Sequence, residues 1–465
     1  MKIMSHSDDA RLADPLRMLS AFSLGSGSTV AAVAMSVATT KIVATFMGAE
    51  GVALSGLFRS LSGTLIAVIG VGSATIIMQR MSSAHTKEES DRVISAGIGL
   101  FAVQAALAAC AALVAAGPIS RWLFGAAAGA GAATEVRIVL VMGAVNLALQ
   151  TAIALLKGQP DVRLVAAVNL ATAAVSLLLA YPLIDRLGRF GLAVNVGSGG
   201  LAGLLIASVL ILRAYRPSVS YATLASSWRF WRAAVGDSAW LVLQSVGMLS
   251  GTLLIQSIIG RHYGLASLGY YNAAMLILDS LVLVAMGSMR AYALPALGRI
   301  QDGSLRLSFF SRSLTLLAGI NLSASLLLIA AAGLALRVLF SAELSAGAEF
   351  LAVSSLSLVG LSFAWSYNTV LLKNGDIRLL TLLDLASMAL LVAAVWLAAR
   401  WNLPLLYCAW AHAGVQAALG AAYMSAAALR YGSEWARFRD AAFGLAGLAA
   451  TTCAYFLARR MAAFA

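Results

Sequence analysis

The sequence predicts an all-α polytopic membrane protein. We expect two parallel, pseudo-symmetric six-helix lobes around a central cavity and an extra C-terminal helix. Of the 465 residues, 61% are hydrophobic and 11% are charged, with a mean hydropathy of +0.89. Soluble domains carry about 25% charged residues, so this composition excludes a soluble or disordered chain. Long continuous apolar runs favour helices over the alternating strands of a β-barrel.

Apolar runs long enough for one membrane crossing, about 20 residues, recur along the whole chain. The predicted spans are 18–40, 52–78, 93–116, 138–156, 164–183, 191–212, 238–260, 268–296, 313–336, 350–372, 379–399, 405–429 and 441–458.

These spans organise the chain into five parts. We expect a cytoplasmic segment 1–17, an N-lobe 18–212, an interlobe linker 213–237, a C-lobe 238–429 and a C-terminal segment 430–465 that holds the thirteenth helix. The linker is basic and aromatic, which suits a helix on the cytoplasmic membrane surface. An ordinary solvated loop is the alternative.

The distribution of basic residues predicts the orientation. With the N-terminus in the cytoplasm, 20 of the 32 Lys and Arg residues fall in inside segments and 10 in outside segments. This bias follows the positive-inside rule, and it accounts for the net charge of +13 without a nucleic-acid partner. We therefore expect a multi-pass membrane protein with its N-terminus in the cytoplasm. Arg459 and Arg460, beyond the last span, run against the rule.

Self-similarity at an offset of 216 residues predicts two copies of one six-helix unit. Six crossings return the chain to the same side, so the copies are parallel, with their axis along the membrane normal. The matched features are Arg121-Trp-Leu-Phe124 with Arg337-Val-Leu-Phe340, Leu155-Leu-Lys157 with Leu371-Leu-Lys373, and Gly48 with Gly264.

The first helix of each copy carries a line of polar residues, here called a polar stripe. Each has the spacing i, i+7, i+11, which places its residues on one helix face. If both stripes face the gap between the lobes, they line a cavity; alternatively, they only join helices. The stripes are Thr29, Ser36 and Thr40, and Ser245, Thr252 and Gln256.

Two charged residues fall deep within predicted spans, where an ionisable group is costly and indicates function. Arg59 lies about 12 Å along its helix from Gly51, and Asp279 lies on the equivalent helix of the second copy. They could form a structural ion pair. Alternatively, Arg59 binds an anionic group, and Asp279 sets the cavity charge or carries the coupling ion.

Four other basic residues are candidates for the same cationic cavity. Arg290 lies about 16 Å along the helix beyond Asp279, and Lys41, Lys157 and Lys373 lie at the ends of spans. A cation near a helix end also anchors the helix at the membrane interface, so each has this second interpretation.

The sequence predicts a transporter and not an enzyme. It lacks a nucleophile–base set, metal-ligand spacing and a phosphate-binding loop. We expect no bound cofactor and no metal. Energy coupling to a proton or sodium gradient stays open.

The stretch from Lys41 through Gly48 and Gly51 to Arg59 resembles the start of bacterial polysaccharide flippases of the Wzx type. In the second copy, Leu278-Asp-Ser280 followed by Leu294-Pro-x-Leu297 is similar to that family's Ser-Asp and Leu-Pro-x-Leu motifs. The two Leu-Leu-Lys turns resemble its paired lysine positions. The resemblance extends over about residues 18–430.

The resemblance implies the fold of the MATE-like multidrug/oligosaccharidyl-lipid/polysaccharide flippase superfamily. It implies an undecaprenyl-pyrophosphate-linked oligosaccharide substrate, an O-antigen (lipopolysaccharide) or exopolysaccharide unit. It also implies a location in the bacterial inner membrane, where alternating access would carry this unit from the cytoplasmic to the periplasmic leaflet. The implied partners are this substrate, membrane lipids, and a glycan polymerase with its chain-length partner.

Two other functions stay open. A drug/ion antiporter of the same superfamily would need an acidic cavity, which Asp279 favours and Arg59 and Arg290 oppose. A membrane-embedded glycan polymerase or ligase would need large outer loops with acidic residues, and the longest predicted outer loop, 117–137, is rich in Gly and Ala.

Overall fold

The computed structural model describes residues 15–70, 73–84, 86–125, 131–157, 162–215, 221–300, 302–432 and 438–462. Within these ranges the regular elements are helices and no β-strand is present, so the predicted all-α class is confirmed. The helices are α2 (Pro15–Gly70), α3 (Ser73–Ser82), α4 (Lys87–Val114), α5 (Ala116–Phe124), α6 (Ala132–Lys157), α7 (Val162–Tyr215), α8 (Tyr221–His262), α9 (Leu265–Arg299), α10 (Gly303–Leu339), the 3-10 helix η2 (Glu343–Gly347), α11 (Ala348–Ser355), α12 (Ser357–Lys373), α13 (Ile377–Arg400), α14 (Leu406–Tyr431) and α15 (Phe438–Ala462).

Helices α2 and α7 are each long enough for the two crossings that the sequence predicts there. As straight helices their 56 and 54 residues would be about 80 Å long, far more than the ~30 Å hydrocarbon core. Gly48 (φ 61°) interrupts α2, and Gly188 (φ 53°) interrupts α7. Glycine adopts positive φ with little strain. The two glycines therefore separate the first span from the second and the fifth from the sixth.

The other helices account for the remaining predicted spans. By length and composition, eight helices of the described chain can cross a membrane, or nine if α11 and α12, which meet at 43°, count as one span. That count treats α2 and α7 as one helix each and does not include α14 and α15. Each of the predicted spans overlaps a described helix or one half of α2 or α7, and the last two, 405–429 and 441–458, overlap α14 and α15.

The 216-residue repeat reappears in the positions where helices begin, break and end. Five landmarks share the offset, although little of the sequence between them matches. The pairs are Gly48 and Gly264 (both with positive φ), Thr86 and Asp302 (N-caps of α4 and α10), Ala115 and Ala331 (breaks in the third helix of each copy), Ala132 and Ala348 (first residues of α6 and α11), and Lys157 and Lys373 (last residues of α6 and α12).

By packing, the chain divides into two compact units. Unit 1 comprises Met1–Val33 and Tyr270–Ala465, and unit 2 comprises Ala34–Gly269. The first helix of the second copy, α8, belongs to unit 2, where it packs against α4 and α5. The compact units thus follow packing, whereas the lobes 18–212 and 238–429 follow the repeat and stay a prediction.

The predicted linker 213–237 is helical at both described ends. Residues 213–215 complete α7, and residues 221–237 form the first turns of α8, continuous with the seventh span. Residues 216–220, and residues 1–14 of the predicted N-terminal segment, lie outside the described residues.

Unit 1 is held together by close contact between α12 and α14. A Cβ atom added at Gly360 would lie 2.7 Å from the Ala417 backbone nitrogen, so the two backbones touch at this point. Tyr367 and Tyr423 are fully buried beside this contact. Without a hydrophobic driving force between helices in lipid, such close backbone approach provides the van der Waals contact that joins them.

Unit 2 is built around α6, which packs against α3, α4, α5 and α7. Inside this unit, a polar side chain forms hydrogen bonds with the carbonyl groups at the end of a neighbouring helix. The Gln104 Nε2 atom of α4 donates to the Ile69 and Gly70 carbonyls at 3.2 and 3.3 Å. The last carbonyls of a helix lack partners within that helix, so Gln104 caps α2 where lipid offers no hydrogen-bond donor.

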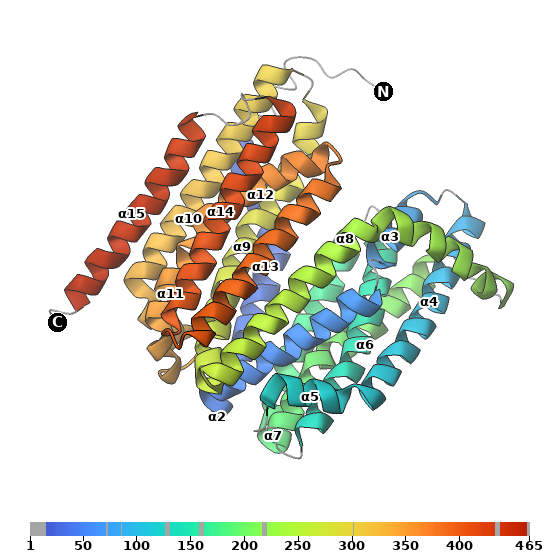
Figure 1. Cartoon of the computed structure of the whole chain (residues 1–465). Coiled ribbons are helices and arrows are strands. Elements are labelled where there is room, and N and C mark those ends of the chain that lie inside the picture. The colour runs from blue at the N-terminus through green and yellow to red at the C-terminus, as the bar shows by residue number, and fades with distance from the viewer. Residues whose placement is uncertain are drawn as a thin grey trace. The chain divides into compact units, whose positions relative to one another are not determined.

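The thirteenth helix, α15, lies beside α10 and also contacts α12 (Figure 1). The C-terminal part of α15 is joined to α11 by polar contacts. The Tyr455 hydroxyl donates to Glu349 Oε1 at 2.8 Å, and Arg459 Nε lies 3.3 Å from the same oxygen. Glu349 therefore neutralises one of the two arginines that run against the positive-inside rule.

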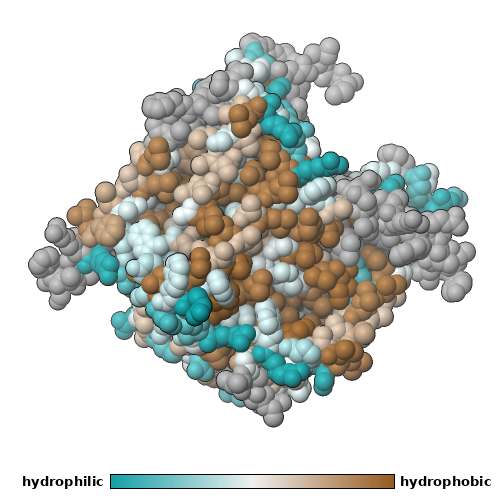
Figure 2. All heavy atoms as spheres, in the orientation of Figure 1, coloured by the Kyte–Doolittle hydropathy of each residue, from teal (hydrophilic) through white to brown (hydrophobic). Residues whose placement is uncertain are grey.

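The outer surface suits lipid. Many large apolar side chains are exposed along the spans, among them Leu113, Leu178 and Leu327. On the face drawn in Figure 2, hydrophobic side chains cover most of the helix surface, and hydrophilic ones gather toward the helix ends. In water such a surface would aggregate, so it indicates a bilayer environment.

The α12–α14 contact leads to a stability prediction. Gly360→Ala forces its new Cβ against the Ala417 backbone, and overpacking of this kind costs about 1–3 kcal/mol. We expect the thermal midpoint of the protein in detergent to fall by several degrees. Gly414→Ala, on α14, is the matched control because nothing lies within 4 Å of its Cβ position. An equal midpoint for the two variants would show that the helices separate freely here.

Candidate functional site

The polar stripes bond largely to their own helices. The hydroxyls of Thr40, Ser245 and Thr252 donate to carbonyls four residues earlier at 3.0, 2.9 and 3.0 Å. Thr40 is buried, whereas Ser245 is exposed. Back-bonding of this kind satisfies a hydroxyl without water. These three hydroxyls therefore do not require an aqueous cavity, and the role of the stripes as cavity lining stays a prediction.

The remaining stripe residues are covered to different extents. Thr29 and Ser36 are half-buried, and Gln256 is 5% exposed. Because Ser36, Thr40 and all of the second stripe belong to unit 2 while Thr29 belongs to unit 1, the stripes are not confined to separate units as the predicted lobes imply.

Arg59 lies in the second half of α2, and its side chain is exposed. Its Nη2 atom donates to the Ser55 hydroxyl, one turn earlier, at 3.2 Å. The preceding residues, Leu57 and Phe58, are fully buried, so the helix anchors one face in unit 2 and presents the guanidinium on another. A guanidinium offers several N–H donors in a fixed plane, a geometry that matches phosphate.

Asp279 lies in α9, and its side chain is also exposed. At the 216-residue offset Arg59 corresponds to Met275, one helical turn before Asp279, and Asp279 corresponds to Gly63. The two charges therefore stand at neighbouring levels of equivalent helices, each present in one copy only. That the side chains of Arg59 and Asp279 face one another stays a prediction.

The three lysines take the places that the repeat predicts. Lys41 is exposed, seven residues before the Gly48 turn. Lys157 and Lys373 are the last residues of α6 and α12; Lys157 is exposed and Lys373 is half-buried. Cations here also complement the partial negative charge of a helix C-terminus, which supports the anchoring alternative. The Arg290 side chain lies outside the described residues.

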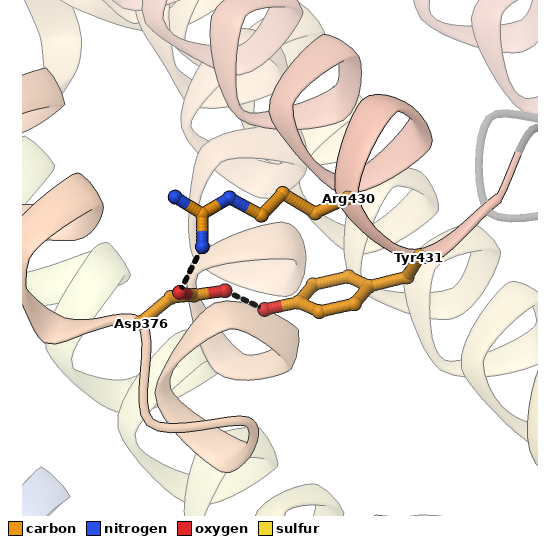
Figure 3. Close-up of polar contacts among 3 residues, drawn as sticks. All are labelled: Asp376, Arg430 and Tyr431. Carbon is orange, nitrogen blue, oxygen red and sulfur yellow. Dashed lines mark hydrogen bonds and ion pairs between the residues drawn. The ribbon is translucent and has the colours of Figure 1, made fainter.

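A cluster of charges fixes the turn that follows Lys373. Arg430 Nη1 lies 2.6 Å from Asp376 Oδ1, and the Tyr431 hydroxyl donates to Asp376 Oδ2, as Figure 3 shows. In the first copy Tyr215, the equivalent of Tyr431, donates to the Leu155 carbonyl at 3.3 Å. The tyrosine that ends the sixth helix thus bonds to the last turn of the fourth helix in the first copy, and to the turn after that helix in the second copy.

A second cluster surrounds Asp384, seven residues into α13. The Tyr423 hydroxyl of α14 donates to Asp384 Oδ1 at 2.7 Å, and Asn368 Nδ2 of α12 donates to the tyrosine oxygen at 3.1 Å. The three residues come from the consecutive helices α12, α13 and α14. Sequence reasoning missed the cluster, because the spacing along one helix does not show which side chains of its neighbours it meets.

Comparison with known proteins agrees with this architecture. Residues 20–301 match a family model described as polysaccharide biosynthesis protein. Among solved structures, the lipid II flippase MurJ in an inward closed conformation has a TM-score of 0.72 at 11% identity, over 94% of this chain and 92% of that chain. An inward-facing multidrug resistance MATE family transporter of the MOP superfamily has a TM-score of 0.66 at 15% identity, over 90% and 96%.

A MOP superfamily transporter from Pyrococcus furiosus has a TM-score of 0.62 at 14% identity, over 95% of this chain and 99% of that chain. No curated protein sequence matches this chain. At these identities the solved structures establish the fold alone. The predicted fold, that of the multidrug/oligosaccharidyl-lipid/polysaccharide (MOP) flippase superfamily, is confirmed.

The Asp376 cluster leads to a prediction about local opening. Asp376→Ala removes the partner of both Arg430 and Tyr431 and frees the turn between α12 and α13. Hydrogen bonds to a charged group contribute about 1.5–3 kcal/mol, so we expect trypsin to cleave after Lys373 or Arg378 at least about tenfold faster in inside-out vesicles. Cleavage after Lys157 serves as the internal control. Unchanged cleavage of the α12–α13 turn would contradict the role of the cluster.

Proposed function

Because this chain belongs to the polysaccharide biosynthesis protein family, we propose that it is a flippase that moves lipid-linked oligosaccharide units across a membrane. The substrate is an undecaprenyl-pyrophosphate-linked O-antigen or exopolysaccharide unit. It passes from the cytoplasmic to the periplasmic leaflet of the bacterial inner membrane. The N-terminus lies in the cytoplasm, as the distribution of basic residues indicates.

The observation that carries this proposal is the exposed guanidinium of Arg59. It lies eleven residues, or about 16 Å along the helix, beyond the Gly48 turn, near the middle of a ~30 Å hydrocarbon layer. Placing an arginine at the centre of a bilayer costs about 2.5–3.5 kcal/mol on insertion scales. An anionic ligand in a hydrated passage offsets that cost.

The chemistry of a pyrophosphate fits this residue. The group brings two or more negative charges into a medium of low dielectric constant, where a fixed cation stabilises it strongly. Arg59 provides a planar donor set for two phosphate oxygens, and Lys41 acts as a point charge nearer the outer end of α2's first half. Lys157, Lys373 and Arg290 complete the proposed cationic path on the cytoplasmic side.

The glycan and the lipid tail need different surroundings. Sugar hydroxyls need hydrogen-bonding walls, which the residues of the two polar stripes provide if they line the passage. The polyprenyl tail is apolar and stays in the bilayer while the head group moves. Asp279, one helical turn from the level of Arg59, is the proposed site of proton or sodium coupling.

The two-fold repeat supports transport by alternating access. In transporters built from repeats, the substrate site lies between the repeats, and one repeat moves against the other. Here the helix breaks at Ala115 and Ala331 occupy equivalent positions in both copies. Turns with positive φ at Gly48 and Gly264 do the same. These landmarks support a repeated scaffold, and the charges of Arg59 and Asp279 make its two copies chemically different.

A variant of Arg59 tests the proposal. In cells that lack the native protein, Arg59→Ala should restore surface polysaccharide at least about tenfold less well than the wild type, because it removes charge-assisted hydrogen bonds worth about 1.5–3 kcal/mol. Arg59→Lys should retain part of the activity. Arg92→Ala, an exposed arginine on α4, is the matched control. Full activity of a membrane-inserted Arg59→Ala protein would remove Arg59 from the site.

A further inference from the structure

A hollow of about 350 Å³ lies in unit 2, between the end of α5 and the last turns of α8. This volume is within the range of small-molecule sites. Under the proposed orientation, both helix ends lie at the periplasmic side. The hollow is lined by Trp122, Leu254, Ser257, Ile258, Arg261 and His262.

The residues that line the hollow change from apolar to basic along α8, an order that matches the chain and the phosphate of a lipid. Leu254 and Ile258 are one turn apart and form its apolar part, toward the middle of the helix. Arg261 and His262 form its basic part, at the helix end. Trp122 stands beside them on α5, 39% exposed, as expected for an aromatic residue at the membrane interface. A phosphate with an apolar chain matches this order of groups.

The basic end retains unused donors. Arg261 Nη1 lies 3.5 Å from the Trp122 carbonyl, a long and weak hydrogen bond, and the Ser257 hydroxyl donates to the same carbonyl at 3.3 Å. Within the described chain Arg261 has no carboxylate partner. The His262 ring makes an edge contact with Tyr263, at 4.8 Å between ring centres. A phosphate on Arg261 and His262 would meet two donor groups without displacing an ion pair.

The internal repeat provides a comparison. At the 216-residue offset Trp122 corresponds to Val338, Arg261 to Thr45 and His262 to Phe46. The equivalent positions of the repeat, on α10 and α2, thus lack the aromatic and basic residues of the hollow. The basic end of the hollow is therefore not a requirement of the scaffold, unlike the lysines at the two cytoplasmic turns.

We propose that this hollow binds the phosphate group of a lipid in the periplasmic leaflet. The phosphate lies on Arg261 and His262, and the first part of the lipid chain lies along Leu254 and Ile258. The site depends on the proposed orientation but not on the transported substrate. Its lipid phosphate is that of an anionic phospholipid or of a polyprenyl pyrophosphate arriving in the outer leaflet.

Native mass spectrometry of the full-length protein in detergent tests this site. The probes are phosphatidylglycerol, undecaprenyl pyrophosphate, and diacylglycerol as a lipid without phosphate. We expect Arg261→Gln with His262→Gln to weaken binding of at least one phosphate lipid about fivefold or more, and to leave diacylglycerol unchanged. The probe that responds identifies the source of the phosphate. Arg186→Gln, an exposed arginine near the Gly188 turn, is the matched control.

Two further variants separate binding from folding. His262→Gln alone leaves the Arg261–Trp122 contact intact, so a loss of phosphate-lipid binding in this variant reports on the site itself. Arg261→Lys should recover most of the binding lost in Arg261→Gln. Unchanged binding of both phosphate lipids in the double variant would overturn the proposal. An equal loss of diacylglycerol would also overturn it, because the hollow would then recognise only apolar chains.

Discussion

The structure depends on one constraint: a backbone in hydrocarbon must find all its hydrogen-bond partners within the protein. A helix pairs its backbone groups along its length, so the groups that still need partners are those at the helix ends. Gln104 caps the end of α2, and glycines with positive φ allow α2 and α7 to turn within one or two residues. Hydroxyls in the spans, such as that of Thr252, bond to their own helix. With the hydrogen bonds at the helix ends satisfied in this way, the spans pack against one another by close contact.

The repeat shows which features belong to the scaffold and which belong to function. Helix starts, breaks and turns recur at one offset, and so do the lysines that end α6 and α12. Tyr215 and Tyr431 occupy equivalent positions, and Tyr215 bonds to the last turn of the fourth helix whereas Tyr431 bonds to the turn after it. Arg59, Asp279 and the Arg261–His262 pair have no equivalent in the other copy. Charges present in one copy only are not part of the repeated scaffold, so these residues are the first candidates for chemistry.

Much of the fold could be predicted from sequence, because apolar runs and motif spacing report directly on spans and repeats. The predicted span 93–116 missed the start of α4, where Thr86 and Glu89 form a capping box and the helix begins six residues before the apolar run. Other features depend on which helices meet. The Asp384–Tyr423–Asn368 cluster and the packing of α8 in unit 2 need three-dimensional neighbours. Helical spacing showed which residues of each polar stripe share a face, but not what covers that face.

The most direct test of the proposed flippase activity is the location of the lipid-linked units in cells depleted of this protein. Spheroplasts would be treated with an impermeant reagent that attacks only periplasmic glycans, and the lipids would then be extracted. The account predicts that single lipid-pyrophosphate-linked units accumulate, protected, on the cytoplasmic leaflet, and that re-expression clears them. Normal surface polysaccharide without accumulation would contradict it and favour drug export. Accumulation of accessible units would contradict it as well and favour a defect in polymerisation.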